Sequence, residues 1–214
     1  IAFYEKKLKI YEQRFDYNAQ AIFQNNMAYL YFIKGDYDNA WKWFTNSYWM
    51  CRSAKNIGGQ LLNITNAAHV VMTIVEEPDA RKRIHLVKYY NWITGKMREM
   101  LELTEETKSL YATSRMHLYM LLADLVMVNV EYNARADVEA RLNASMRTIR
   151  QSHEADTLLA SALELSQQLR LTAEEAAIHF KRGRLYNVLG EYNDALAALI
   201  ECRKIAALNE PAIL

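Results

Sequence analysis

Apolar residues recur along most of the chain at the spacing of one helix face. Between Gln60 and Val75 they stand at 61, 64, 68, 71, 72 and 75, which is a helical period. The same pattern predicts helices over Ala2–Phe15, Tyr17–Lys34, Tyr37–Ala54, Gln60–Val75, Ala80–Leu103, Thr104–Tyr132, Glu154–Leu169, Ala173–Leu189 and Tyr192–Leu208. The whole chain has only six Gly and two Pro, so helix breakers are rare and we expect an all-α protein.

Two parts of the chain repeat one helical hairpin. In the first, a helix ends near Lys34, a tight Gly35-Asp36-Tyr37 turn follows, and a second helix runs to Ala54. The second copy has small, aromatic and turn residues at the same spacing. The two sets are Ala28, Tyr31, Gly35, Asp36, Tyr37 and Ala40, and Gly183, Tyr186, Gly190, Glu191, Tyr192 and Ala195. Two copies of one hairpin predict a repeat protein.

These residues resemble the tetratricopeptide repeat family, with the clearest matches over 21–54 and 176–211. The usual Trp and Leu of the first helix are Gln24 and Met27 in one copy and His179 and Arg182 in the other. The resemblance implies a right-handed superhelical array of antiparallel helical hairpins, an α-solenoid, over 1–214 as a single array. Because the sequence starts without Met, we expect it to be a fragment of a longer chain.

The segment 133–151 does not fit the alternation of first and second helices. Its apolar stripe is thin, and the other positions are mostly polar or charged. Either 133–169 is one long bent helix, or 133–151 is a helical insertion looped out of the array. The low apolar content favours the insertion.

The resemblance implies that the first helices line a concave groove that holds peptides or extended segments of partner proteins. Side chains that do not pack between hairpins are the candidates, and asparagine offers both a donor and an acceptor to a peptide backbone. The lysine and arginine suit a carboxylate. The predicted groove residues are Asn25, Tyr29, Phe32, Asn63, Asn66, Asn129, Lys181, Arg184 and Asn187. The alternative is that these side chains are merely solvated.

The helix over 37–54 is apolar on more than one stripe. Trp43, Trp49 and Met50 are the predicted anchors of a second interface, with another protein or with another copy of this chain. The alternative is that the long neighbouring helices bury them.

The charge and composition of the chain limit the classes of partner that we expect it to bind. Lys and Arg number 26 and Asp and Glu 25, which gives a net charge of +1 and no overall attraction to nucleic acid. The densest basic run, 81–83, indicates a solvated helix face. No apolar run is long enough to span a membrane. Cys51 and Cys202 fall in different hairpins, so we expect free thiols in a reducing compartment, with a cytoplasmic location favoured over a nuclear one.

Catalytic motifs are missing from the sequence. The five histidines are scattered, and neither a zinc motif nor a glycine-rich phosphate loop occurs. We therefore expect a protein without enzymatic activity, metal or cofactor. The predicted function is a scaffold that binds a peptide or protein segment within a larger protein or complex. The alternative is a ligand-sensing module that controls an attached effector or DNA-binding domain.

Overall fold

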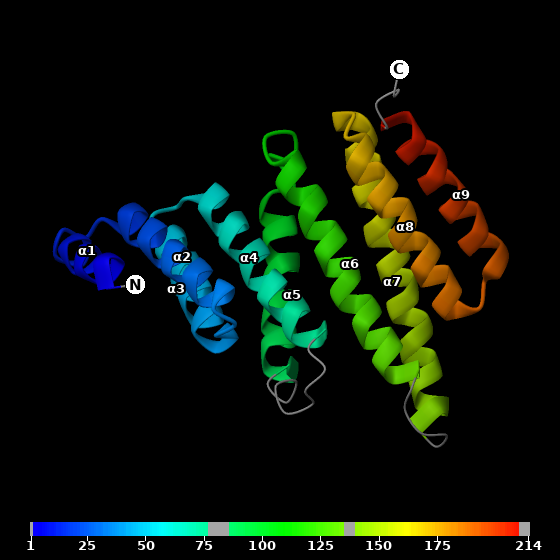
Figure 1. The fold of residues 1–214 in the computed structure, drawn as a ribbon, viewed down its shortest axis with the longest axis horizontal. Helices are drawn as coiled ribbons and strands as arrows, with labels where there is room; N and C mark the ends of the chain where they lie inside the picture. The colour runs from blue at the N-terminus through cyan, green and yellow to red at the C-terminus, as the bar shows by residue number, and fades with distance from the viewer. Residues whose placement is uncertain (1, 77–85, 135–139, 210–214) are drawn as a thin grey trace. The chain divides into compact units, whose positions relative to one another are not determined.

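The computed structural model of the protein describes residues 2–76, 86–134 and 140–209, with side chains over 3–75, 89–128 and 150–208. These residues form nine helices and no strand, which confirms the all-α class (Figure 1). The helices are α1 (Ala2–Gln13), α2 (Tyr17–Ile33), α3 (Tyr37–Ser53), α4 (Ile57–Glu76), α5 (Leu86–Leu103), α6 (Ala112–Ala134), α7 (Ala140–Leu169), α8 (Thr172–Leu189) and α9 (Tyr192–Asn209). The predicted start of the fifth helix at Ala80, and the basic run 81–83, lie outside the described residues.

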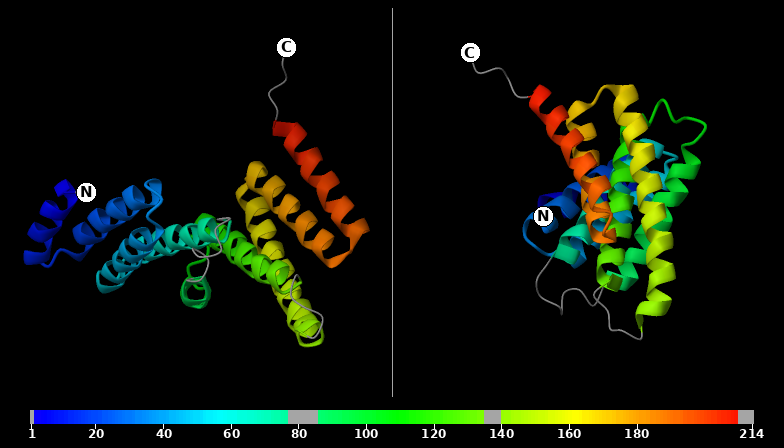
Figure 2. Two further views of the ribbon diagram at one scale, coloured as in Figure 1. Left: turned by 60° about the horizontal axis from the view of Figure 1, so that its bottom comes forward. Right: turned by 90° about the vertical axis from the view of Figure 1, so that its right-hand side faces the viewer.

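The chain divides into two compact units, Ile1–Leu103 with α1 to α5 and Thr104–Leu214 with α6 to α9. Within each unit, helices pack mainly against their neighbours in the chain, and α2 also contacts α4 as α6 contacts α8. Figure 2 shows α8 and α9, in orange and red, as an antiparallel pair joined by a tight turn. Packed helical hairpins are therefore present in both units, and their arrangement as one superhelical array remains a prediction.

One type of turn closes five of the described helices. The backbone is left-handed, with φ between 54° and 79°, at Phe15, Gly35, Lys55, Arg170 and Gly190. In each case the next N–H donates to the carbonyl five residues earlier, over 2.8–3.1 Å, which is the bond of a Schellman motif. The left-handed residues are 20 positions apart within each unit. The turns predicted at Gly35 and Gly190 are confirmed, and three more carry the same geometry without glycine.

The residue after the turn caps the next helix in the first unit. The side-chain oxygens of Asp16, Asp36 and Asn56 each accept a backbone N–H three residues later, over 3.0, 3.2 and 2.8 Å respectively. Such caps satisfy a donor that the helix start would leave unpaired. Each helix end is thus coupled to the next helix start, which fixes the direction in which the chain returns.

Two helix starts in the second unit differ from the predicted ones. Leu171 is the N-cap of α8 and makes no side-chain capping bond, so α8 begins at Thr172, one residue before the predicted start. Thr104 does not begin a helix, because residues 104–111 form turns and α6 starts at Ala112. A threonine does not cap a helix when its hydroxyl is bonded to another side chain, as is the case for Thr104.

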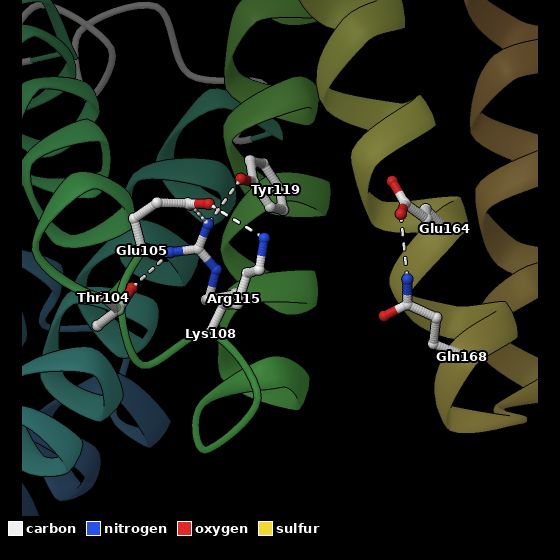
Figure 3. A network of polar contacts seen from close by, with 7 residues as sticks. All are labelled: Thr104, Glu105, Lys108, Arg115, Tyr119, Glu164 and Gln168. Carbon is white, nitrogen blue, oxygen red and sulfur yellow. Dashed lines mark hydrogen bonds and ion pairs between the residues drawn. The ribbon is translucent and has the colours of Figure 1, made fainter.

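The hydroxyl of Thr104 is bonded to Arg115, whose side chain is only 4% exposed. The guanidinium donates to the Thr104 hydroxyl over 2.8 Å, to the Tyr119 hydroxyl over 3.0 Å and to the Glu105 carboxylate (Figure 3). A buried guanidinium needs such partners, since desolvation of an unpaired charge is costly. The network holds the turns of 104–111 against α6.

Small residues let the helices of each hairpin approach, as the sequence indicates. Ala28 of α2 and Ala40 of α3 are fully buried. A Cβ on Gly183 of α8 would lie 2.8 Å from Cγ of Leu199 on α9, closer than side chains pack. These positions tolerate little added volume because packed helices leave few voids.

The described part of segment 133–151, which did not fit the alternation of first and second helices, belongs to longer helices. Helix α7 runs without interruption for 30 residues from Ala140 to Leu169 and packs along α6. Residues 140–151 are therefore its first turns, and the interpretation as a looped-out insertion is wrong for them, while 135–139 lie outside the described residues. The thin apolar stripe misled the prediction because it gave no sign that this segment continues into the helix predicted from Glu154.

The left-handed turns predict opposite effects of glycine at two lysines. Lys55 has φ 55°, which is unfavourable for a side chain with a Cβ, so Lys55→Gly should raise the free energy of unfolding by about 0.5 kcal/mol. Lys34 caps α2 with φ −76°, and Lys34→Gly should lower it by a similar amount. Urea unfolding monitored by circular dichroism measures both. Equal losses in the two variants would contradict the role given to the left-handed turn.

Candidate functional site

The faces of α2 and α4 that meet in the first unit form the first candidate site. The Nδ2 of Asn66 donates to Oδ1 of Asn25 over 3.0 Å, which joins the two helices directly. Because asparagine is short, this bond requires a close approach of the two backbones, as their contact confirms. Two of the predicted groove residues therefore touch each other.

Exposed apolar side chains surround this pair. On α2, Ile22, Tyr29 and Ile33 are 60%, 57% and 65% exposed, and on α4 Leu62 is 54% exposed. Positions 22, 29 and 33 share one helix face, and Leu62 is one turn before Asn66. Ile22 and Leu62 are 40 residues apart, twice the spacing of the turns, so they occupy equivalent positions in successive hairpins. We call Ile22, Asn25, Tyr29, Ile33, Leu62 and Asn66 the α2–α4 face.

Two other predicted groove residues of this unit lie differently. Asn63 is only 2% exposed, and its Nδ2 donates to the Gly59 carbonyl over 2.8 Å beside the Cys51 sulfur. It faces α3, so its amide is not accessible to a ligand, and burial raises the pKa of the Cys51 thiol there. Phe32 is half-buried and its ring lies 5.9 Å from that of Tyr37. The sequence could not separate Asn63 from Asn66, because both suit a polar helix face.

In the second unit, Lys181 of α8 pairs with Asp124 of α6 over 2.6 Å. Both side chains are mostly buried, with exposures of 21% and 12%, so the ammonium is committed to an ion pair inside the protein. Arg184 and Asn187 are exposed on the same helix. The sequence predicts that Lys181 binds a ligand carboxylate together with Arg184. In the structure its ammonium pairs with Asp124 instead. The side chain of Asn129 lies outside the described residues.

An aromatic pocket between α3 and α5 is the second candidate site. Trp41, Thr45 and Trp49 of α3 and Tyr89 and Trp92 of α5 line a cavity of about 180 Å³. We call this the aromatic pocket. Sequence reasoning missed it because Tyr89 and Trp92 stand 48 and 51 residues from Trp41, and no local pattern pairs them.

The Tyr89 hydroxyl anchors one side of this pocket. It donates to Oδ1 of Asp38 over 2.8 Å, and Tyr89 is only 8% exposed. Burial, together with the adjacent carboxylate, raises the pKa of Tyr89 to about 12, because both disfavour the phenolate. Tyr89 is therefore a neutral phenol at physiological pH, fixed in orientation by Asp38.

The three residues of the predicted second interface lie in different environments. Trp49 is 40% exposed and lines the aromatic pocket, whereas Trp43 and Met50 are half-buried and do not line it. Arg52 and Lys96 each lie 5.4 Å from the centroid of Trp49. No contact with a partner tests this interface, so it remains a prediction.

The described residues contain no group of three or more His, Cys, Asp or Glu side chains placed to hold a metal ion. His179 is half-buried, and burial lowers its pKa, so the imidazole is neutral at pH 7. Among the helices described here, none is both long and apolar enough to cross a membrane. No protein-family model and no curated protein matches the chain, so the tetratricopeptide resemblance rests on the residues given above.

The Lys181–Asp124 pair predicts a loss of stability when its charge is reversed. Lys181→Glu places two carboxylates together in a mostly buried contact and should lower the free energy of unfolding by about 3 kcal/mol. Arg184→Glu, one turn away on an exposed position, should change it by less than about 1 kcal/mol. Chemical denaturation of both variants measures the difference. Equal stability of the two would show that the pair is not structural.

Proposed function

We propose that the protein is an interaction scaffold that binds an extended segment of a partner protein on the α2–α4 face. One observation carries this: the Asn25–Asn66 hydrogen bond lies among four apolar side chains that are each more than half exposed. Exposed apolar groups clustered around polar ones are typical of protein-binding surfaces. The resemblance to tetratricopeptide repeats supports the same function, and an α-solenoid is the architecture that we propose with it.

The chemistry of the asparagine pair suits a peptide backbone. Each side chain has a carbonyl and an NH2 group, and the bond between them uses one acceptor and one N–H. Asn25 keeps its NH2 group, and Asn66 keeps its carbonyl oxygen. A neighbouring donor and acceptor of this kind match the C=O and N–H of an extended peptide, which presents both along its edge.

Affinity would come from the apolar side chains. Full burial of a leucine side chain contributes about 1.5–3 kcal/mol. Ile22 and Leu62, at equivalent positions of successive hairpins and each about one turn before an asparagine of the pair, offer two such contacts. The asparagines would set the position of the backbone, and these side chains would select apolar residues in the partner segment.

The test uses peptides selected from a random display library against the intact chain. Leu62→Gln removes an exposed apolar contact of the α2–α4 face and keeps good helix propensity. We expect it to weaken the selected peptides by about tenfold, or 1.4 kcal/mol, in fluorescence anisotropy. Asn66→Ala should weaken them as well, through lost backbone bonds.

Leu103→Gln is the matched control. Leu103 ends α5 and is 52% exposed, against 54% for Leu62, so the same substitution removes a similar apolar surface elsewhere in the unit. Its peptide affinity should stay within about twofold of the unchanged chain, because no contact with the site is removed. The proposal fails if no peptide is selected, or if Leu62→Gln and Leu103→Gln bind alike.

A further inference from the structure

We propose that the aromatic pocket between α3 and α5 binds a quaternary ammonium group. This site is separate from the α2–α4 face and does not depend on the function proposed for it. The geometry of the rings carries the inference, together with the charges beside them.

Rings from two helices form walls that meet at steep angles. Trp41 and Trp92 lie 5.3 Å apart with their planes at 77°, and Trp49 and Trp92 lie 6.5 Å apart at 65°. Tyr89 also lines the pocket and lies 4.5 Å from Trp41 at the smaller angle of 33°. Because the tryptophan rings of these two pairs stand at steep angles and do not stack face to face, several ring faces or edges border the same space. The cavity of about 180 Å³ is several times the roughly 30 Å³ of one water molecule.

The electrostatics of this pocket favour a cation. The faces of aromatic rings are negative, and a cation above a tryptophan is attracted most strongly. Trp49 already holds two cations of its own chain, since Arg52 and Lys96 lie 5.4 Å from its centroid without lining the pocket. Glu99 pairs with both, at 3.1 Å from Arg52, and its single carboxylate offsets one of their two positive charges. Asp38 adds a carboxylate at the Tyr89 side.

The polar groups select a methylated ammonium over a free one. A primary ammonium has three N–H donors that need acceptors, whereas a quaternary ammonium has none. Among the described residues that line the pocket, only Thr45 has an aliphatic hydroxyl, and it donates to the carbonyls of Trp41 and Lys42, both at 2.9 Å. The Tyr89 hydroxyl is bonded to Asp38. A quaternary ammonium group, which contacts ring faces and needs no hydrogen-bond acceptor, therefore fits the aromatic pocket best.

The experiment compares choline with 3,3-dimethylbutan-1-ol, its neutral isostere, by tryptophan fluorescence of the intact chain. Three of the four tryptophans line the pocket, so the signal reports on it. Choline should bind at least about tenfold more tightly than the isostere, because only the cation gains from the ring faces. A blocked trimethyllysine, compared with blocked lysine, forms the second arm, and the tighter of choline and trimethyllysine identifies the source of the group.

Two tryptophan variants locate the site on α3. Trp49→Leu should weaken choline or trimethyllysine by about tenfold through loss of a ring wall. Because Trp49 is 40% exposed, the chain should stay folded, which far-ultraviolet circular dichroism checks. Trp43→Leu, on the same helix but outside the pocket, should leave affinity unchanged within about twofold. The proposal is overturned if the isostere binds as tightly as choline, if neither quaternary probe binds, or if Trp49→Leu binds as the unchanged chain does.

Discussion

The structure depends on one type of link, which joins five of the described helices to the helix that follows. A single left-handed residue ends the helix, a Schellman bond satisfies its last carbonyls, and the following residue precedes a new helix. In the first unit Asp16, Asp36 and Asn56 also cap the new helix. Because this link recurs at 20-residue intervals from Phe15 to Lys55, α2 and α3 are both 17 residues long, and α2 and α4 have equivalent residues facing the same way.

This regular link explains why the α2–α4 face exists. Residues 40 apart occupy equivalent positions, so Ile22 and Leu62 are both exposed, while Gln20 and Gln60 are both buried. Alternate helices are then close enough for Asn66 to reach Asn25. In the second unit, alternate helices are also in contact, and there Lys181 of α8 pairs with Asp124 of α6. Contacts between alternate helices thus hold a partly exposed pair of amides in one unit and a mostly buried ion pair in the other.

The sequence predicted the helices well because their apolar period is strong, and it predicted the turns only where glycine stands at the left-handed residue. Gly35 and Gly190 have that signal, whereas Phe15, Lys55 and Arg170 adopt the same conformation with side chains that do not indicate it. The Asp and Asn caps at 16, 36 and 56 were the usable signal for the period. Asn63 and Lys181 were placed on a surface because burial is decided by partners on other helices, Cys51 and Asp124, which no local pattern reveals.

The two candidate sites differ because the side chains between their helices differ in size. Short side chains on α2 and α4 let these helices touch, so the two asparagines meet directly and no pocket-forming rings stand between them. Between the described parts of α3 and α5, long and aromatic side chains make the contact, as in Arg52 with Glu99 and Trp41 with Trp92. Indole rings are rigid and cannot fill an irregular space completely. The aromatic pocket is the consequence, and its ring walls are the reason for proposing a quaternary ammonium as its ligand.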